Sequence, residues 1–253
     1  MKKFLVIALA LIMAFSFTAC GGGGNADTNT DAPADNEKPA DTQTEPAGSP
    51  SDAYSKYIEA KGAAYDRLTA KIEQHDELAL TAGMAMLPIV MVDLALLPLT
   101  ILGVEGGEAA LEMFGMQGIN IDKDGDIYTI TYQDEEGNTT TQTCEFDAKT
   151  DSMRSVASDG SKDTLVFEYV NTGDGYASQY TVYSEENGEY SLITSYFNDT
   201  DFVGFGIQTV KGEPDSIFKN TGLGADFIKN DESYFMLEGD EMTIFMDGET
   251  NTY

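Results

Sequence analysis

The sequence predicts an α+β fold in which N-terminal helices pack against a long antiparallel β-meander. Residues 51–117 show helical spacing or unbroken apolar runs, whereas residues 118–253 alternate with a period of two between closely spaced turn motifs. A meander of about ten strands must curl or close, because open twisted sheets rarely run flat beyond that number. We therefore expect residues 51–253 to form one domain, a curved sheet or half-barrel wrapped around helices.

The first twenty residues show the pattern of an export signal. Met1-Lys2-Lys3 carries positive charge, Phe4 to Phe17 is apolar, and Thr18-Ala19-Cys20 ends the run. This arrangement resembles the lipobox of bacterial lipoprotein precursors. The resemblance implies a signal peptide at residues 1–19 that is removed, and a lipidated Cys20 that becomes the mature N-terminus. It also implies attachment to a cell membrane on its extracytoplasmic side.

An uncleaved membrane anchor is the alternative for this segment. The fourteen apolar residues from Phe4 to Phe17 would extend only ~21 Å as a helix, which is shorter than the ~30 Å hydrocarbon core of a bilayer. Two acyl chains on Cys20, by contrast, would hold a protein stably at ~0.8 kcal/mol for each buried CH₂ group. The lengths therefore favour a lipid anchor.

Residues 20–50 are predicted to be the lipidated N-terminus and a disordered linker. Between Gly21 and Pro50 the chain contains no aromatic or branched aliphatic residue, so it cannot bury enough apolar surface to offset the entropy of ordering. A flexible chain of this length reaches roughly 30 Å. We expect it to space the domain from the membrane.

The charge and cysteine content exclude several classes of partner and stabilisation. The formal charge is −30, and removal of Lys2 and Lys3 leaves 12 basic against 44 acidic residues, a charge of −32. Nucleic acid is excluded as a partner, because its binding needs clustered cations. Cys144 is the only other cysteine, so no internal disulfide forms, and its alternating strand context favours a buried apolar role over a reactive thiol.

Residues 51–117 contain three helical segments. From Ser51 to about Leu80, apolar residues recur on one face of an amphipathic helix that carries His75, the only histidine, on its solvated side. Ala82 to Val104 holds a single charged residue, Asp93. Prolines at 88 and 98 break this run, which favours a buried pair of short helices over a segment that lies in or on the membrane. A short helix from Glu108 to Met116 follows.

Residues 118–253 are predicted to form strands joined by short acidic turns. Strands such as Ile127 to Tyr132 and Thr164 to Val170 alternate apolar and polar residues, and Asp-Gly and Asn-Gly clusters separate them. The thirteen tyrosines fit the core of a sheet with one wet side, or a binding face. Gly204 and Gly206 indicate a bend in their strand rather than a phosphate-binding loop.

Candidate sites of chemistry are weak in this sequence. Asp122, Asp124 and Asp126 alternate like calcium ligands, but the loop lacks the glycine and glutamate of an EF-hand, which favours a hairpin turn. His75 has no nucleophile or metal-ligand pattern beside it. We expect no catalytic residue, metal ligand or cofactor, and Cys20 is the only site residue predicted.

The order of elements resembles, in outline, the half-barrel of bacterial lipoprotein carriers, although no motif accompanies the likeness. It suggests a non-catalytic binding module of the cell envelope that holds a lipid or another apolar small molecule. Docking of another envelope protein through the sheet is the alternative. In the first case six residues would line or plug the cavity, namely Met84, Met86, Leu87, Ile89, Val90 and Met91.

Overall fold

The computed structural model describes residues 49–104, 106–134, 136–160 and 163–253. The predicted signal peptide at residues 1–19, Cys20 and all but the end of the predicted linker lie outside these residues. The described chain contains helices in its first third and strands from residue 117 onward. The predicted order of elements is therefore confirmed.

Helix α2 spans Pro50–Ile72 and begins at a well-formed cap. The Ser49 hydroxyl accepts a hydrogen bond from the backbone N–H of Asp52 at 3.1 Å, and Pro50 occupies the first turn, where no N–H is needed. The helix ends about eight residues before the predicted Leu80, because residues 73–76 are all polar and none of them is fully buried. His75 lies in the turn that follows rather than on the helix.

Helix α3 spans Ala79–Ala95 and continues as the short 3-10 helix η1, Leu97–Ile101. Pro98 lies at the start of η1 and marks the predicted break. Pro88 does not break α3, because it faces solvent, where water can satisfy the carbonyl that lacks an N–H partner. No helix among the described residues combines the length and apolarity needed to cross a bilayer. The third helix, α4, spans Glu108–Glu112 and is shorter than predicted.

Eleven strands form one antiparallel sheet in which every strand pairs with its neighbours in the sequence. β1 and β11 are the two edges, so the sheet is open and is not closed into a barrel. The predicted long meander is confirmed, with eleven strands in place of about ten. The strands are β1 Gln117–Asp124, β2 Ile127–Gln133, β3 Thr139–Asp147, β4 Ser152–Ser158, β5 Asp163–Asn171, β6 Gly175–Ser184, β7 Glu189–Asn198, β8 Phe202–Val210, β9 Ser233–Glu238, β10 Glu241–Met246 and β11 Glu249–Thr252.

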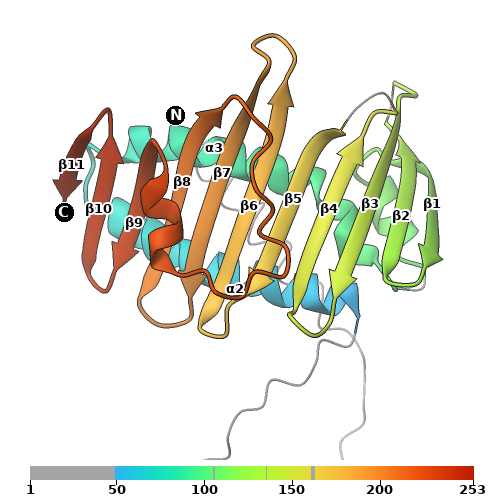
Figure 1. Cartoon of the computed structure of the whole chain (residues 1–253), viewed down its shortest axis with the longest axis horizontal. Coiled ribbons are helices and arrows are strands. Elements are labelled where there is room, and N and C mark those ends of the chain that lie inside the picture. The colour runs from blue at the N-terminus through green and yellow to red at the C-terminus, as the bar shows by residue number, and fades with distance from the viewer. Residues whose placement is uncertain (1–48, 105, 135, 161–162) are drawn as a thin grey trace, which may run out of the picture. The chain divides into compact units, whose positions relative to one another are not determined.

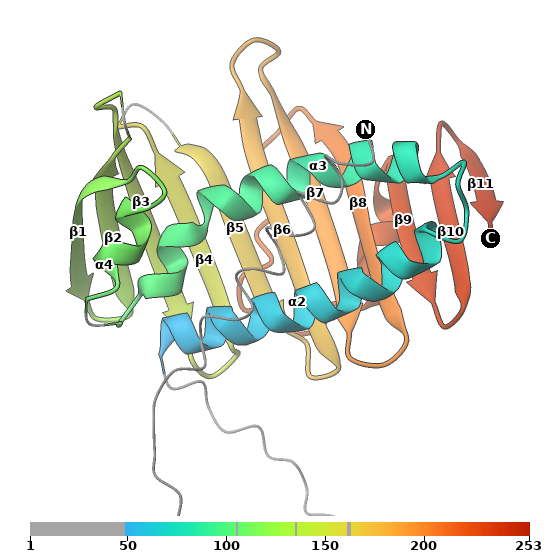
Figure 2. The same cartoon turned by 180° about the vertical axis from the view of Figure 1, so that it is seen from behind.

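The main core lies between the sheet and the two long helices, α2 and α3, which cross the same face (Figure 2). Its centre is aromatic. The ring of Tyr57 stacks on that of Tyr169 with centroids 4.6 Å apart, and Phe167 and Phe197 pack against Tyr57 at 5.8 and 5.7 Å. These rings fill the space between the helices and the sheet. Most of the tyrosines on the inner face therefore serve the core.

The opposite face of the sheet is partly covered by residues 211–232, which we call the strap (Figure 1). The strap connects β8 to β9 and includes the 3-10 helix η2, Ala225–Asn230. Ile228 of η2 is fully buried in a second, smaller core with Tyr196 and Phe202. The sheet is thus covered on both faces near β5 to β8.

Candidate functional site

The six residues predicted to line an internal cavity do not do so as a group. Ile89 is buried in the main core, and Met86 and Val90 are half-buried. Met84, Leu87 and Met91 are exposed and point away from the sheet, so the prediction is wrong for these three residues. The physical reason is that α3 is apolar on all sides, while only one of its faces can pack on the sheet.

The exposed face of α3 forms a continuous apolar line, which we call the α3 stripe. Its members are separated by four and three residues in alternation, a spacing that places them along one side of a helix. Their exposed fractions run from 37% to 65%, and Pro88 is exposed beside them. The stripe consists of Leu80, Met84, Leu87, Met91 and Leu94.

A partly buried ion pair joins α3 to α2. The Lys61 ammonium on α2 lies 2.7 Å from both carboxylate oxygens of Asp93, the only charged residue of α3. Tyr180 of β6 joins the pair, since it accepts a hydrogen bond from Lys61 at 2.8 Å and donates one to Asp93 at 3.2 Å. Tyr57 contacts the Tyr180 hydroxyl at 3.1 Å. The contacts link α2, α3 and the sheet at one point.

The electrostatics of this cluster keep its phenols neutral. Burial, followed by the negative charge of Asp93, raises the pKa of Tyr180 well above that of a free tyrosine. The same two causes raise the pKa of Tyr57. Both hydroxyls therefore remain protonated and available as donors. The cluster pairs the charge of Asp93 with that of Lys61, and no other charged residue lies on α3.

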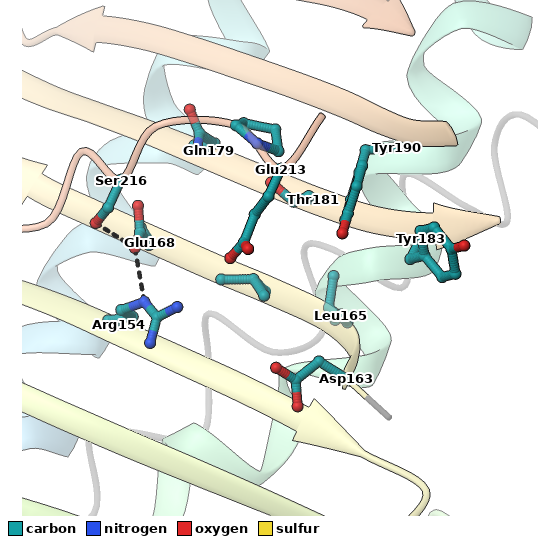
Figure 3. A pocket seen from close by; sticks show the side chains of 12 residues that line it. Arg154, Asp163, Leu165, Glu168, Gln179, Thr181, Tyr183, Tyr190, Glu213 and Ser216 are labelled. Atoms are coloured by element: carbon teal, nitrogen blue, oxygen red, sulfur yellow. Dashed lines mark hydrogen bonds and ion pairs between the residues drawn. The ribbon is translucent and has the colours of Figure 1, made fainter. Parts of the chain in front are cut away.

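A second candidate surface is a groove of about 280 Å³ on the opposite face, between the strap and strands β4 to β7 (Figure 3). Leu165 and Val166 contribute apolar lining, Thr181 lies nearby, and Tyr183 and Tyr190 stand at one end with ring centroids 5.0 Å apart. Asp163, Glu213 and the Arg154–Glu168 pair supply charge. We call this cavity the strap groove.

Two buried carboxylates hold the strap in place. Glu168 accepts hydrogen bonds from Arg154 at 2.9 Å and, on the strap, from the Ser216 hydroxyl and the Ile217 N–H, both at 2.7 Å. Asp231 accepts hydrogen bonds from the Thr194 hydroxyl and from the Gln208 amide. The strap is therefore held at two places, residues 216–217 and Asp231, and the first of these lies beside the groove.

Burial raises the pKa of Asp231 to about 6, against the hydrogen bond from Thr194 that lowers it. The carboxylate lies directly over Gly206 of β8, where a Cβ atom would overlap it. A Cβ at Gly204 would likewise overlap Ile228. These two glycines let the strap pack directly on the sheet. The bend predicted from the sequence does not include this role.

The other residues singled out in the sequence have structural roles. Cys144 is fully buried, and burial raises the pKa of its thiol to about 12. His75 packs its ring edge against Tyr253. Asp122, Asp124 and Asp126 belong to the β1–β2 hairpin. Among the described residues, no group of three or more His, Cys, Asp or Glu side chains is arranged to hold a metal ion.

Comparison with known proteins adds no relative. No protein-family model, no curated protein sequence and no solved structure matches this chain.

Proposed function

We propose that this protein is a lipid-anchored, extracytoplasmic, non-catalytic binding module that docks through the α3 stripe. The exposed stripe is the observation that carries the proposal. A contiguous row of Leu and Met side chains exposed to water is unfavourable in free energy unless something covers it. Met side chains adapt their shape to a partner and are common on binding surfaces. In this proposal the sheet is a curved platform that presents α3 outward, in place of a cup.

The size of the stripe explains why an anchor is needed. The exposed fractions of its five side chains are together equivalent to between two and three fully exposed ones. At ~1.5–3 kcal/mol for each buried side chain, complete coverage contributes about 4–8 kcal/mol. Association alone costs an estimated ~4–15 kcal/mol. The stripe by itself would thus bind weakly, and a tether that raises the effective concentration to roughly millimolar makes the contact frequent.

The experiment that tests this function separates the anchor from the stripe. Cells make the wild-type chain, the Cys20→Ser variant and the Met84→Glu/Met91→Glu variant. We expect fatty-acid labelling and membrane recovery for wild type and for Met84→Glu/Met91→Glu. We expect Cys20→Ser to lose both. Hydrogen exchange then compares α3 in membrane-bound wild type and in the released Cys20→Ser protein.

Slower exchange of α3 amides in the membrane-bound protein supports docking. Equal exchange rates in the two preparations would show that nothing covers the stripe. Recovery of unlabelled Cys20→Ser protein in the membrane fraction would contradict the lipid anchor. The Glu variant is the matched control. Its α3 amides should exchange at the rate of the released protein while its anchor remains intact.

The strap groove supports a second candidate function, the binding of a small polar or cationic ligand. A pair of tyrosine rings beside Asp163 and Glu213 offers both a stacking surface and negative charge, as in sites for organic ammonium ions. Titration with tetramethylammonium tests it. Shifts of the Tyr183 and Tyr190 NMR signals that saturate, and that disappear in Glu213→Gln, would support this function, and unsaturable shifts would contradict it.

A further inference from the structure

We propose that the α3 stripe docks on the surface of the lipid bilayer to which the chain is anchored. The inference rests on the proposed function and names the partner of the same surface. It follows from the charge distribution, from the place where the described chain begins, and from the surroundings of the stripe.

The charge of the protein is distributed unevenly. Residues 79–104 contain one charged residue, Asp93, and its charge is paired with that of Lys61. Residues 118–253 contain 28 acidic and only 7 basic residues. A membrane with anionic lipids repels the acidic sheet and does not repel the uncharged stripe. The domain is therefore oriented with its helical face toward the bilayer and its sheet away from it.

The start of the described chain lies at the same end of the molecule as the C-terminal end of the α3–η1 segment. Ser49 caps the N-terminus of α2, and a Cβ atom on Gly103, just after η1, would lie 3.9 Å from the Cβ of Ser49. Cys20 precedes Ser49 by 29 residues. Their composition predicts a flexible reach of roughly 30 Å. The 17-residue helix α3 is ~25 Å long, so the whole stripe is within reach of an anchoring membrane.

Exposed apolar side chains continue beyond the stripe toward this end. Val104, Met113 and Phe114 are 45%, 86% and 46% exposed, and they flank α4, which packs beside η1. α2, α3 and α4 lie on the same face of the sheet (Figure 2). Apolar side chains exposed at two places on one face suit a planar partner such as a bilayer.

A second copy of the chain is a poorer partner for the stripe. The outward side of α2, which lies beside α3, exposes three carboxylates and one cation, namely Asp52, Glu59, Asp66 and Lys56. Pairing of two stripes would bring these carboxylates of both copies close together, within a dimer of two chains that each carry a charge of −32 once Lys2 and Lys3 are removed. A bilayer region of zwitterionic lipid carries no net charge and avoids this repulsion.

The test uses the mature chain from Cys20 onward, coupled through the Cys20 thiol to maleimide-bearing lipid in phosphatidylcholine vesicles with and without phosphatidylglycerol. Cys144 is fully buried and does not compete for the reagent. The chain contains no tryptophan, so Met84→Trp supplies a single reporter on the stripe. Tyr183→Trp, on the opposite face, is the matched control. Coupling is verified by mass, which makes the test independent of natural lipidation.

We expect the tryptophan emission of Met84→Trp to shift to the blue on coupling, and lipids with brominated acyl chains to quench it several-fold more than the emission of Tyr183→Trp. Added Leu87→Glu/Met91→Glu should abolish both effects. Added salt should strengthen docking on phosphatidylglycerol vesicles, because it screens repulsion of the acidic sheet. Equal quenching in the two variants would overturn the proposal. A blue shift of Met84→Trp without vesicles, accompanied by a dimer mass, would instead assign the stripe to a second copy.

Discussion

Removal of the Lys61 ammonium tests the reasoning about how α3 is held. In Lys61→Met the side chain keeps similar length and apolar contacts, but Asp93 loses the partner that lies 2.7 Å from both its oxygens. Tyr180 remains as its single hydrogen-bond donor. Removing one partner of a buried pair costs ~3–5 kcal/mol. Because the Asp93 side chain is 28% exposed and water can reach it, we expect the lower end, about 3 kcal/mol.

Urea unfolding followed by circular dichroism measures this loss of free energy. For a domain of this size the same change corresponds to a decrease in melting temperature of roughly 6–12 °C. Lys56→Met is the matched control, since Lys56 is exposed on the same helix. It should change stability by no more than ~0.5 kcal/mol.

The double variant Lys61→Met/Asp93→Leu removes both charges and should recover most of the lost stability, because apolar residues can replace a buried ion pair. If Lys61→Met and Lys56→Met were equally stable, the ion pair would not hold α3. If the double variant were less stable than Lys61→Met, the charge of Asp93 would not be the source of the loss.

Three further predictions concern the strap and the buried thiol. Because burial raises the Asp231 pKa to about 6, its ionised form destabilises the folded protein above that pH. Asp231→Asn should therefore add about 1–3 kcal/mol at pH 7.5 and nothing near pH 4, measured by urea unfolding, and a pH-independent gain would contradict this. Gly206→Ala should force the strap away from β8 and speed hydrogen exchange of residues 225–232; unchanged exchange would refute the close packing. In Cys20→Ser, Cys144 should react with Ellman's reagent only in denaturant, and reaction of the native protein would show that the thiol is accessible.

The meander was predictable because its determinants are local. Strand alternation and turn residues repeat along the chain, and each hairpin joins sequence neighbours, so no long-range information was needed. Burial of Cys144 followed from the same alternation. The predicted end of α2 at Leu80 is too late, because the apolar spacing continues at Leu78 and Ala79, beyond the polar residues 73–76.

The orientation of α3 was not predictable from its own residues. A helix that is apolar on every side carries no periodic signal of which face packs inward. Its inward side contacts the core through Ala82, Ile89 and Val92. Asp93 pairs with Lys61, 32 residues away, and with Tyr180, which is 119 residues from Lys61. Pairing over such distances is a tertiary property. The Asp93 charge within an apolar run was the one available signal, because it requires a buried cation or exposure to water.

The strap groove was missed for a similar reason. Its walls come from β4 to β7 and from a connection that has little regular structure. Nothing in the sequence distinguishes Glu168 and Asp231 from the other acidic residues. The fold shows that both are buried and hold the strap. Gly204 and Gly206 gave a signal, since alternate glycines in a strand allow another segment to approach closely.

Accessibility of position 84 in membranes from cells that make the protein is the most direct measurement of the central claim. Met84→Cys and Tyr183→Cys would be treated with a membrane-impermeant maleimide before and after detergent solubilisation, with Cys144 buried and silent. We predict that the thiol introduced at position 84 is protected in membranes and labelled in detergent, whereas the thiol introduced at position 183 is labelled in both. Equal labelling of the two positions in membranes would contradict docking through the α3 stripe.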